Sequence, residues 1–307
     1  MSRPFAMLLA CLLAACAGCQ HYTIEVTLDA DGGGRRVTEL ACDAPGPTPE
    51  AALSHFREGF ALSEAAGWQR VERADEPQRL VFRRERSLAA PADWSGLSGE
   101  IAIPGRPGTA ASGVLFANAV EVELTPVDGG RSLSYRERFE WQGILPAAAG
   151  ILGELGEAAL AADYPALDPL ARAELRGLLA GAALRYIALE QEDAGEPAYE
   201  TFLTALAEQA RGIVARVAPS AAADAIAERL DGVLRGGGEE GDQRVAERLP
   251  GLDLVAATDL ELRLTLPGPI GETNADRVEG NTAVWVFGLS DALLEPVQLY
   301  ARTRVGD

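Results

Sequence analysis

A strand, a turn and a second strand near the C-terminus constrain the fold of this chain more than any other feature. Between Leu260 and Leu266, leucine alternates with polar residues, so an extended strand would have one apolar and one polar face. Residues Pro267–Gly271 then interrupt the strand, because proline donates no amide hydrogen bond and glycine permits positive φ. The next segment, Thr282–Phe287, is apolar on both faces, which is typical of a strand covered on each side. This pattern predicts a β-sheet organised around the two strands.

The first part of the chain predicts a hairpin. Apolar residues alternate along Tyr22–Leu28 and Arg36–Cys42, which flank the turn Asp29–Gly34. The turn resembles the start of a calcium-binding loop, but glycine occupies the fifth position (Gly33) and leucine the twelfth (Leu40), where such loops place oxygen ligands. We therefore expect a hairpin turn and no cation site.

A second hairpin is predicted from the segments Val114–Thr125 and Arg131–Trp141, which flank a turn at Val127–Gly130. One face of its second strand is apolar and mostly aromatic, formed by Leu133, Tyr135, Phe139 and Trp141. Glu137 interrupts that face. A glutamate there is either a buried functional acid or, as we favour, a member of an ion pair or a rim residue.

The segment between the two hairpins predicts mixed structure. A helix is expected from Thr48, as N-cap, to about Ala66, and it would cover the sheet. Two strands, Trp68–Ala74 and Arg79–Arg86, follow it. The segment Ala89–Gly113 is long and rich in proline and glycine, which predicts a loop.

Residues 145–250 differ from the rest because alanine, leucine and glutamate dominate and the apolar spacing becomes helical. Helices are expected to begin near Asp168, Glu196 and Pro219. Their apolar sides would either pack against each other in a bundle or lie on a membrane. We favour the bundle, because the polar sides lack the cationic excess of membrane-surface helices. The segment is thus predicted as a helical insertion in a sheet domain made of residues 16–144 and 251–307.

Residues 1–15 have the features of a bacterial lipoprotein signal peptide. A short basic start precedes an apolar run that is too short to span a bilayer. Leu13–Cys16 resembles the lipobox, whose cysteine receives a diacylglycerol and becomes the mature N-terminus. The alternatives are an ordinary secretory signal with incidental cysteines and a poorer lipobox at Leu8–Cys11.

A lipid at Cys16 predicts a membrane-anchored protein of the cell envelope. Many lipoproteins that stay in the inner membrane have aspartate directly after the lipidated cysteine, whereas this chain has Ala17. This difference favours the outer membrane, facing the periplasm, in a Gram-negative host. Two cysteines would remain beyond the anchor, Cys19 and Cys42. They either form a disulfide in the oxidising envelope or remain a tail cysteine and a small buried side chain.

Composition and missing motifs exclude several classes of function. All 27 basic residues are arginine and the formal net charge is −19, which argues against nucleic-acid binding. Only two histidines occur, and the sequence contains no serine-hydrolase elbow, zinc-protease motif, phosphate-binding loop or Cys-x-x-Cys pair. We therefore expect no enzyme activity, no catalytic residue, no metal site and no cofactor.

The C-terminal stretch Leu266–Asp276, followed by Glu279–Trp285, resembles the signature of the LppM-type domain of bacterial envelope lipoproteins. That signature combines a Pro-Gly strand end, an Asn-Ala segment and a glycine before a strand that contains tryptophan. The resemblance implies an α+β fold with a curved antiparallel sheet, and a lipid-binding role. From this resemblance and the patterns above, we expect an α+β protein with a curved antiparallel sheet, a covering helix and a large all-helical insertion.

Two functional hypotheses follow. In the first, the sheet domain binds a lipid or other apolar ligand in a cavity lined by Tyr135, Phe139, Trp141, Trp285 and Phe287, since ligand pockets are mostly apolar. The alternative is that these aromatic residues pack into a dry core that leaves no cavity. In the second hypothesis, the protein is a structural or interaction lipoprotein, and its helical insertion recruits a protein partner.

Overall fold

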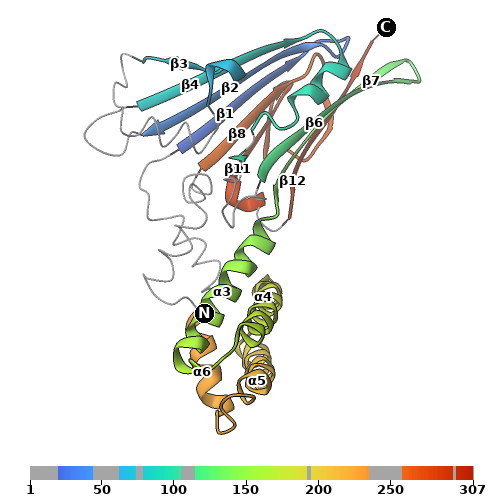
Figure 1. Cartoon of the computed structure of the whole chain (residues 1–307). Coiled ribbons are helices and arrows are strands. Elements are labelled where there is room, and N and C mark those ends of the chain that lie inside the picture. Colours follow the sequence, from blue (N-terminus) through green and yellow to red (C-terminus); the bar gives the residue numbers. More distant parts are fainter. Residues whose placement is uncertain are drawn as a thin grey trace. The chain divides into compact units, whose positions relative to one another are not determined.

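The chain divides into two compact units in the computed structural model, which describes residues 20–43, 62–73, 79–101, 103–104, 115–191, 195–234, 258–292 and 295–306. Among these residues, the unit called the helical unit contains the helices of residues 144–234. The other, called the sheet unit, contains the strands that lie between residues 20 and 305. Figure 1 labels the four helices and most of the strands of the two units.

Within the described residues, the helical unit has four helices: α3 (Ile144–Asp163), α4 (Pro169–Gln191), α5 (Gly195–Val214) and α6 (Ala223–Leu234). Helix α4 begins as predicted, because the Asp168 carboxylate accepts a hydrogen bond from the Ala171 amide at 2.8 Å and caps the first turn. Helices α3 and α4 approach closely at Gly153, where a Cβ would lie 2.7 Å from the carbonyl oxygen of Arg176. Side chains from all four helices, including Leu160, Leu175 and Tyr186, are buried together. The apolar sides therefore pack against each other, as the sequence predicted.

Within the described residues, one helical segment, Leu145–Asp163, is long and apolar enough to cross a membrane. Half of that segment is buried inside the structure. Because α3 packs against α4 and α6, this burial is what a core helix of a bundle would show.

The larger sheet of the sheet unit has seven strands among the described residues, in the order β10-β11-β8-β1-β2-β4-β3. Their bounds are Gln20–Leu28 (β1), Gly34–Asp43 (β2), Gln69–Val71 (β3), Arg79–Leu88 (β4), Thr258–Thr265 (β8), Arg277–Glu279 (β10) and Thr282–Gly288 (β11). Strands β1 and β8 are parallel, with Ile24 opposite Leu262, and the other pairs are antiparallel.

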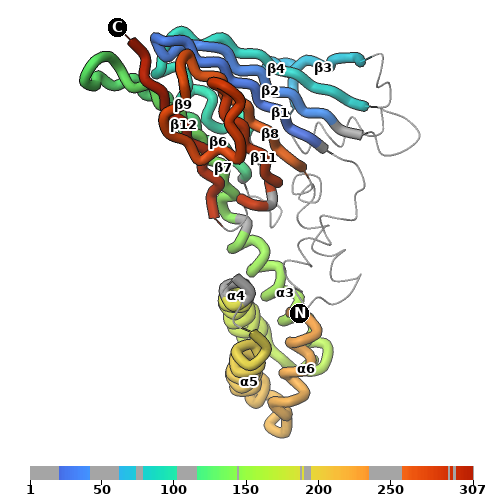
Figure 2. Tube along the Cα trace, turned by 180° about the vertical axis from the view of Figure 1, so that it is seen from behind, coloured from blue at the N-terminus to red at the C-terminus, as the bar shows by residue number. Residues whose placement is uncertain are grey.

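In the part of the chain that the structure describes, the smaller sheet has five strands, in the order β5-β6-β7-β12-β9. Their bounds are Ile103–Pro104 (β5), Leu115–Val127 (β6), Gly130–Gln142 (β7), Ile270–Thr273 (β9) and Val297–Val305 (β12). Three 3₁₀ helices also occur in the described part of the sheet unit: η1 (Glu64–Ala66), η2 (Pro91–Leu97) and η3 (Leu289–Ala292). Figure 2 shows β9 and β12 of this sheet from behind.

The inner faces of the two sheets pack against each other. On the larger sheet the inner face consists of alternate residues of β1 and β8, such as Ile24 and Leu262, both 0 % exposed. On the smaller sheet, Leu133 and Phe139 of β7 are also 0 % exposed. Phe139 contacts Phe287 of β11 across the two sheets, with ring centroids 5.2 Å apart. The core of the sheet unit therefore lies between two layers.

The α+β class is confirmed, and so are both hairpins. The turn of the first is closed by a hydrogen bond from the Asp29 amide to the Gly33 carbonyl, at 2.9 Å. At Gly34, φ is 152° and a Cβ would lie 2.1 Å from the Thr27 carbonyl oxygen, so only glycine is suited to this position. The second hairpin pairs β6 with β7 along their whole length.

The expectation of an antiparallel sheet needs one refinement. The strands form two sheets, and the pairing of β1 with β8 is parallel. These strands are far apart in the sequence, so alternation within each strand carried no information about their relative direction.

The expected cover on both faces of Thr282–Phe287 is correct only for the first half of β11. Ala283, Val284 and Trp285 are buried, whereas Val286 is 46 % exposed. The reason is that β10 pairs only with Thr282–Val284, so the second half of β11 lies at the edge of the sheet.

Three expectations fall outside the described residues, and the first is the signal peptide of residues 1–15 with the lipidation site Cys16. Of the helix expected over Thr48–Ala66, residues 48–61 are outside, and the described end is the 3₁₀ turn η1. Cys19 and the side chain of Cys42 are also outside, so the disulfide stays a prediction.

Candidate functional site

The structure brings together three of the five aromatic residues predicted to line a cavity. Phe139 and Trp141 of β7 lie on either side of Phe116 of β6, at ring-centroid distances of 6.3 and 5.0 Å. Phe287 of β11 joins them from the larger sheet through Phe139. We call Phe116, Phe139, Trp141 and Phe287 the aromatic cluster. Phe116 was missed by the sequence analysis, although it alternates with Asn118 and Val120 on the inward face of its strand.

The other two predicted residues have different neighbours. Tyr135 packs edge-to-face with Trp94 of η2, at a centroid distance of 6.1 Å. The Trp285 indole donates a hydrogen bond to the Asn274 side-chain oxygen at 3.0 Å. Both residues are buried, with exposures of 0 % and 3 %.

The surface of the aromatic cluster is almost entirely apolar. The indole N–H of Trp141 donates to the carbonyl oxygen of Leu289 at 3.0 Å, so its polar atom is already bound by the protein. Phe139 is 0 % and Trp141 8 % exposed, while Phe287 is only partly buried. The cluster is thus a packed apolar region that involves both sheets and reaches the surface at Phe287.

A buried ion pair joins the two sheets beside these residues. Arg36 of β2 donates two hydrogen bonds to the Glu137 carboxylate of β7, both 2.9 Å long. Glu137 also accepts hydrogen bonds from Asn118 Nδ2, at 2.7 Å, and from the Tyr135 hydroxyl. Arg36 and Glu137 are 0 % and 1 % exposed. The structure therefore confirms the interpretation of Glu137 as an ion-paired residue.

A second pair of charges extends this cluster toward β4. The side chain of Glu100, which follows η2, is 4 % exposed and lies 2.6 Å from Arg84 and 2.7 Å from Arg36. Arg84 also donates to the carbonyl oxygen of Ala66 at 3.1 Å, and its guanidinium carbon lies 4.7 Å from the ring centroid of Trp68. We call Arg36, Arg84, Glu100 and Glu137 the charge cluster. Its two arginines and two glutamates balance in formal charge.

The surroundings keep the arginines charged and Tyr135 neutral. Burial acts to lower the pKa of Arg36, but the charge of Glu137 and the hydrogen bonds with Glu137 and Tyr135 outweigh it and raise that pKa above its usual value. Burial, followed by the positive charges of Arg86 and Arg36, lowers the pKa of Arg84 to about 10, so Arg84 stays protonated at neutral pH. Burial, followed by the charge of Glu137, raises the pKa of Tyr135 well above its usual value.

The charge cluster leaves several buried polar atoms without a hydrogen bond. They are Arg36 Nε, Thr38 Oγ1, Arg84 Nε and Glu100 Oε2. Arg36 Nε and Glu100 Oε2 attract each other as ions at 2.7 Å, yet their relative orientation makes no hydrogen bond. Because most buried polar groups are hydrogen-bonded, the region has unused capacity to bind a polar group.

Sequence analysis missed the partners of Glu137. Arg36, Thr38 and Leu40 share one face of β2, and Val37, Glu39 and Ala41 share the other, so both faces mix apolar and polar residues. The inward face was therefore ambiguous. The available signal was Glu137 itself, because an acid on an apolar face requires a cation from another element.

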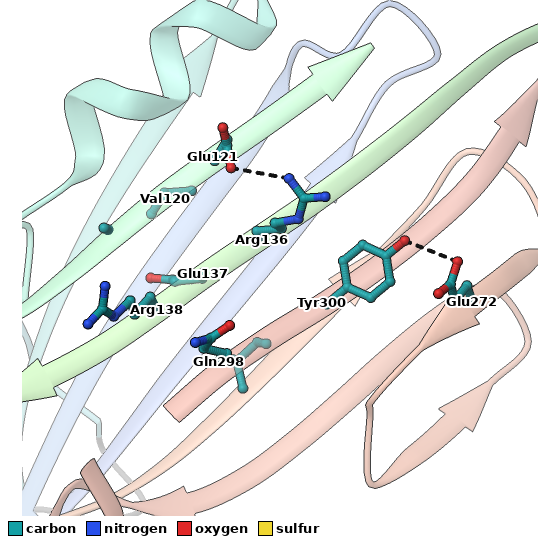
Figure 3. Close-up of a pocket in the computed structure, with 10 residues that line it drawn as sticks. Val120, Glu121, Arg136, Glu137, Arg138, Glu272, Gln298 and Tyr300 are labelled. Carbon is teal, nitrogen blue, oxygen red and sulfur yellow. Dashed lines mark hydrogen bonds and ion pairs between the residues drawn. The ribbon is translucent and has the colours of Figure 1, made fainter. Parts of the chain in front are cut away.

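The outer face of the smaller sheet has a hollow of about 720 Å³, drawn in Figure 3. Arg136 lies over the Tyr300 ring there, 5.6 Å from its centroid, and pairs with Glu121 at 3.4 Å. The Tyr300 hydroxyl donates to Glu272 at 3.2 Å. Glu137 points to the opposite side of the sheet, into the core (Figure 3). The hollow is polar and its acids are paired, and none of the five predicted aromatic residues lines it.

A search of the described residues finds no group of three or more histidine, cysteine, aspartate or glutamate side chains placed to bind a metal ion.

Comparisons with known proteins add one likeness in overall structure. No family model and no curated protein matches the chain. Among solved structures, the chain is similar to the folded domain of the LppM protein of Mycobacterium tuberculosis, determined by NMR. The two are 10 % identical, with a TM-score of 0.35, over 94 % of this chain and 91 % of that domain. A TM-score this low does not establish a shared fold, so the function proposed below is argued from the residues of this chain.

Proposed function

We propose that this chain is a lipid-anchored, non-enzymatic protein of the bacterial cell envelope that binds an apolar ligand between its two sheets. The observation that supports ligand binding is the aromatic cluster, whose four rings come from both sheets and which reaches the surface at Phe287. Parting the sheets at this end would expose aromatic carbon on both sides of a ligand. Such surfaces are the usual walls of apolar binding sites.

The non-enzymatic part of the proposal rests on the buried carboxylates. A general acid or base needs a carboxylate that can exchange a proton with a substrate. Glu137 and Glu100 instead lie against arginines, at 2.9 Å and at 2.6 to 2.7 Å. Both carboxylates are therefore paired with arginine side chains rather than placed to exchange a proton with a substrate.

Ligand binding is tested with tryptophan emission, because all four tryptophans (68, 94, 141 and 285) lie in the sheet unit. The full chain carrying Cys16→Ser is titrated with decanol. We expect a saturable change in emission, and Phe287→Ser should weaken binding roughly tenfold, equivalent to ~1.4 kcal/mol of lost apolar contact. Val286→Ser is the matched control, since Val286 is 46 % exposed and lies on the other face of the same strand. A linear emission change without saturation would count against the proposal.

The anchor is tested in cells. Lipidation at Cys16 is supported by the lipobox-like Leu13–Cys16 and its apolar prelude. Cys16→Ser should shift the protein from the membrane to the soluble envelope fraction or leave an uncleaved precursor. Cys11→Ser, at the poorer match, should change neither property. If Cys16→Ser is processed and retained normally, the anchor is elsewhere.

A second candidate function, recruitment of a protein partner by the helical unit, is favoured by an exposed apolar stripe on α4. Leu170 and Leu184 are 68 % and 42 % exposed, and a Cβ at Gly177 or Gly181 between them would meet no atom within 4 Å. Leu170→Ser with Leu184→Ser should abolish crosslinks formed through α4 in the envelope. Gln209→Ser, at an exposed position of α5, serves as the control, and identical crosslinks in all three proteins would exclude this stripe.

A further inference from the structure

One member of the charge cluster is held differently from the others. Arg36, Arg84 and Glu137 lie on β2, β4 and β7, inside continuous antiparallel ladders. Glu100 lies instead in the irregular segment between η2 and β5. Its position therefore depends less on the sheets than the positions of its partners do.

The segment that contains Glu100 is attached to β6 by few hydrogen bonds among the described residues. The Gly99 amide donates to the Asn118 carbonyl at 2.7 Å, and the Ile101 amide donates to the Asn118 side chain at 3.1 Å. The Ser98 hydroxyl accepts from the Val120 amide at 3.2 Å. Releasing this segment breaks these bonds and the hydrogen bond of 3.1 Å from Arg84 to the Glu100 carbonyl oxygen, whereas moving a strand would break a whole ladder.

The same segment covers apolar surface next to the arginines. Trp94, Leu97 and Ile101 are 0 %, 6 % and 1 % exposed. Withdrawal of the segment would uncover an apolar space that adjoins two cationic side chains. That combination suits an amphiphile with an acidic head group and a hydrocarbon tail.

The polar atoms around the Glu100 carboxylate exceed what it binds. The N–H group at Arg84 Nε and the hydroxyl of Thr38 are buried without hydrogen-bond partners, and Arg36 Nε has an ionic contact of 2.7 Å with Glu100 but no hydrogen bond. Thr38 lies two residues from Arg36 on β2 and directly opposite Arg84 of β4, on the inner face of the sheet. If Glu100 left, the two arginines would face only Glu137, and an incoming anion would restore the balance of charge.

We propose that Arg36, Arg84 and Thr38 form an anion site that Glu100 occupies in the free protein, and that the carboxylate of a fatty acid occupies in the liganded protein. The proposal rests on the proposed function, because it supplies the head-group site for a ligand whose tail is apolar. Glu100 itself demonstrates that a carboxylate fits between the arginines, with contacts of 2.6 and 2.7 Å. Arginine suits this role because it binds carboxylates through paired, charge-assisted hydrogen bonds.

The experiment compares three amphiphiles of equal chain length. The full chain with Cys16→Ser is titrated with decanoate, decanol and decyl phosphate, and binding is measured from tryptophan emission. We expect decanoate to bind about tenfold more tightly than decanol, because only decanoate pairs with the arginines. Glu100→Gln removes the competing carboxylate and should tighten decanoate binding by roughly a further tenfold, while decanol binding stays unchanged.

A control variant removes an acid that lies outside the charge cluster. Glu140→Gln disrupts the pair between Glu140 and Arg138, 2.5 Å apart on the outer face of β7, and should leave decanoate binding unchanged. Arg84→Gln should abolish the preference for decanoate over decanol without abolishing decanol binding. If circular dichroism shows that Glu100→Gln does not fold, the test still rests on Arg84→Gln and on the comparison of decanoate with decanol in the wild-type sequence.

The possible failures are distinguishable. Equal affinity for decanoate and decanol, unchanged in Arg84→Gln, would overturn the anion site and leave the apolar site intact. Tighter binding of decyl phosphate than of decanoate would assign the arginines to a phosphate head group and overturn the fatty-acid assignment. Absence of saturable binding for all three amphiphiles would overturn both the anion site and the proposed function.

Discussion

The buried pair between Arg36 and Glu137 allows a quantitative test of how the two sheets are held together. Replacing Glu137 with leucine removes a carboxylate that accepts two hydrogen bonds from Arg36, one from Asn118 and one from Tyr135. Arg36 would remain buried, with Glu100 as its remaining anionic partner, 2.7 Å away. Leaving one partner of a buried ion pair behind costs roughly 3–5 kcal/mol. We therefore expect Glu137→Leu to lower the free energy of unfolding of the sheet unit by about that amount.

A double-mutant cycle separates the pair from its surroundings. Arg36→Met leaves Glu137 with two neutral donors, so it should also be strongly destabilising. The combination of Arg36→Met and Glu137→Leu should cost much less than the sum of the two, because an apolar pair of similar size replaces both charges. Glu140→Leu is the matched control. Its pair with Arg138 lies on the outer face of the same strand and should contribute at most about 1 kcal/mol.

The assay is chemical denaturation monitored by tryptophan emission, which reports on the sheet unit alone. A thermal melt should show a fall in Tm of roughly 6–20 °C for Glu137→Leu, at about 2–4 °C for each kcal/mol in a domain of this size. The reasoning is refuted if Glu137→Leu costs no more than Glu140→Leu. It is also refuted if the double variant costs the full sum of the single variants, since the two side chains would then be energetically independent.

Three further predictions concern the rest of the fold. Replacing residues 145–250 by a short Gly/Ser linker should leave the sheet unit folded, with wild-type tryptophan emission, and an unfolded product by circular dichroism would show that the two units fold together. Gly153→Leu should destabilise the helical unit by roughly 1–3 kcal/mol, because a Cβ there lies 2.7 Å from a carbonyl oxygen, whereas Gly150→Ala, with no atom within 4 Å, should stabilise it slightly. Both effects are read from the 222 nm ellipticity. The raised pKa of Tyr135 means that the folded state keeps a proton that the unfolded state releases above about pH 10, so the stability contributed by Tyr135 is complete below that pH and is lost as pH rises further. Tyr135→Phe should therefore reduce the fall in unfolding free energy from about pH 9 to about pH 11, and an unchanged slope would contradict the assignment.

Local patterns in the sequence were sufficient for the longer strands, the hairpins and the helix starts, but not for the short strands β9 and β10, which lie where turns were expected. Side-chain alternation at Leu260–Leu266 depends only on the period of an extended chain, and the structure has β8 there with Leu260, Leu262 and Leu264 at 0 % exposure. The cap at Asp168 is equally local, because its carboxylate binds an amide three residues away. The sequence also favoured an ion pair or a rim position for Glu137, since an acid on a buried apolar face is costly without a cation.

Only the tertiary structure decided which groups meet. Arg36 lies about a hundred residues before Glu137 in the chain, and their contact depends on how the two sheets stack. The alternation of side chains along β2 could not show this contact, because neither face of β2 is purely apolar. The same is true of the parallel pair β1 and β8 and of the contact between Phe139 and Phe287, which join segments that are remote in sequence. The periodicity of a strand records the face of each side chain, whereas the partner of that face is set by the path of the whole chain.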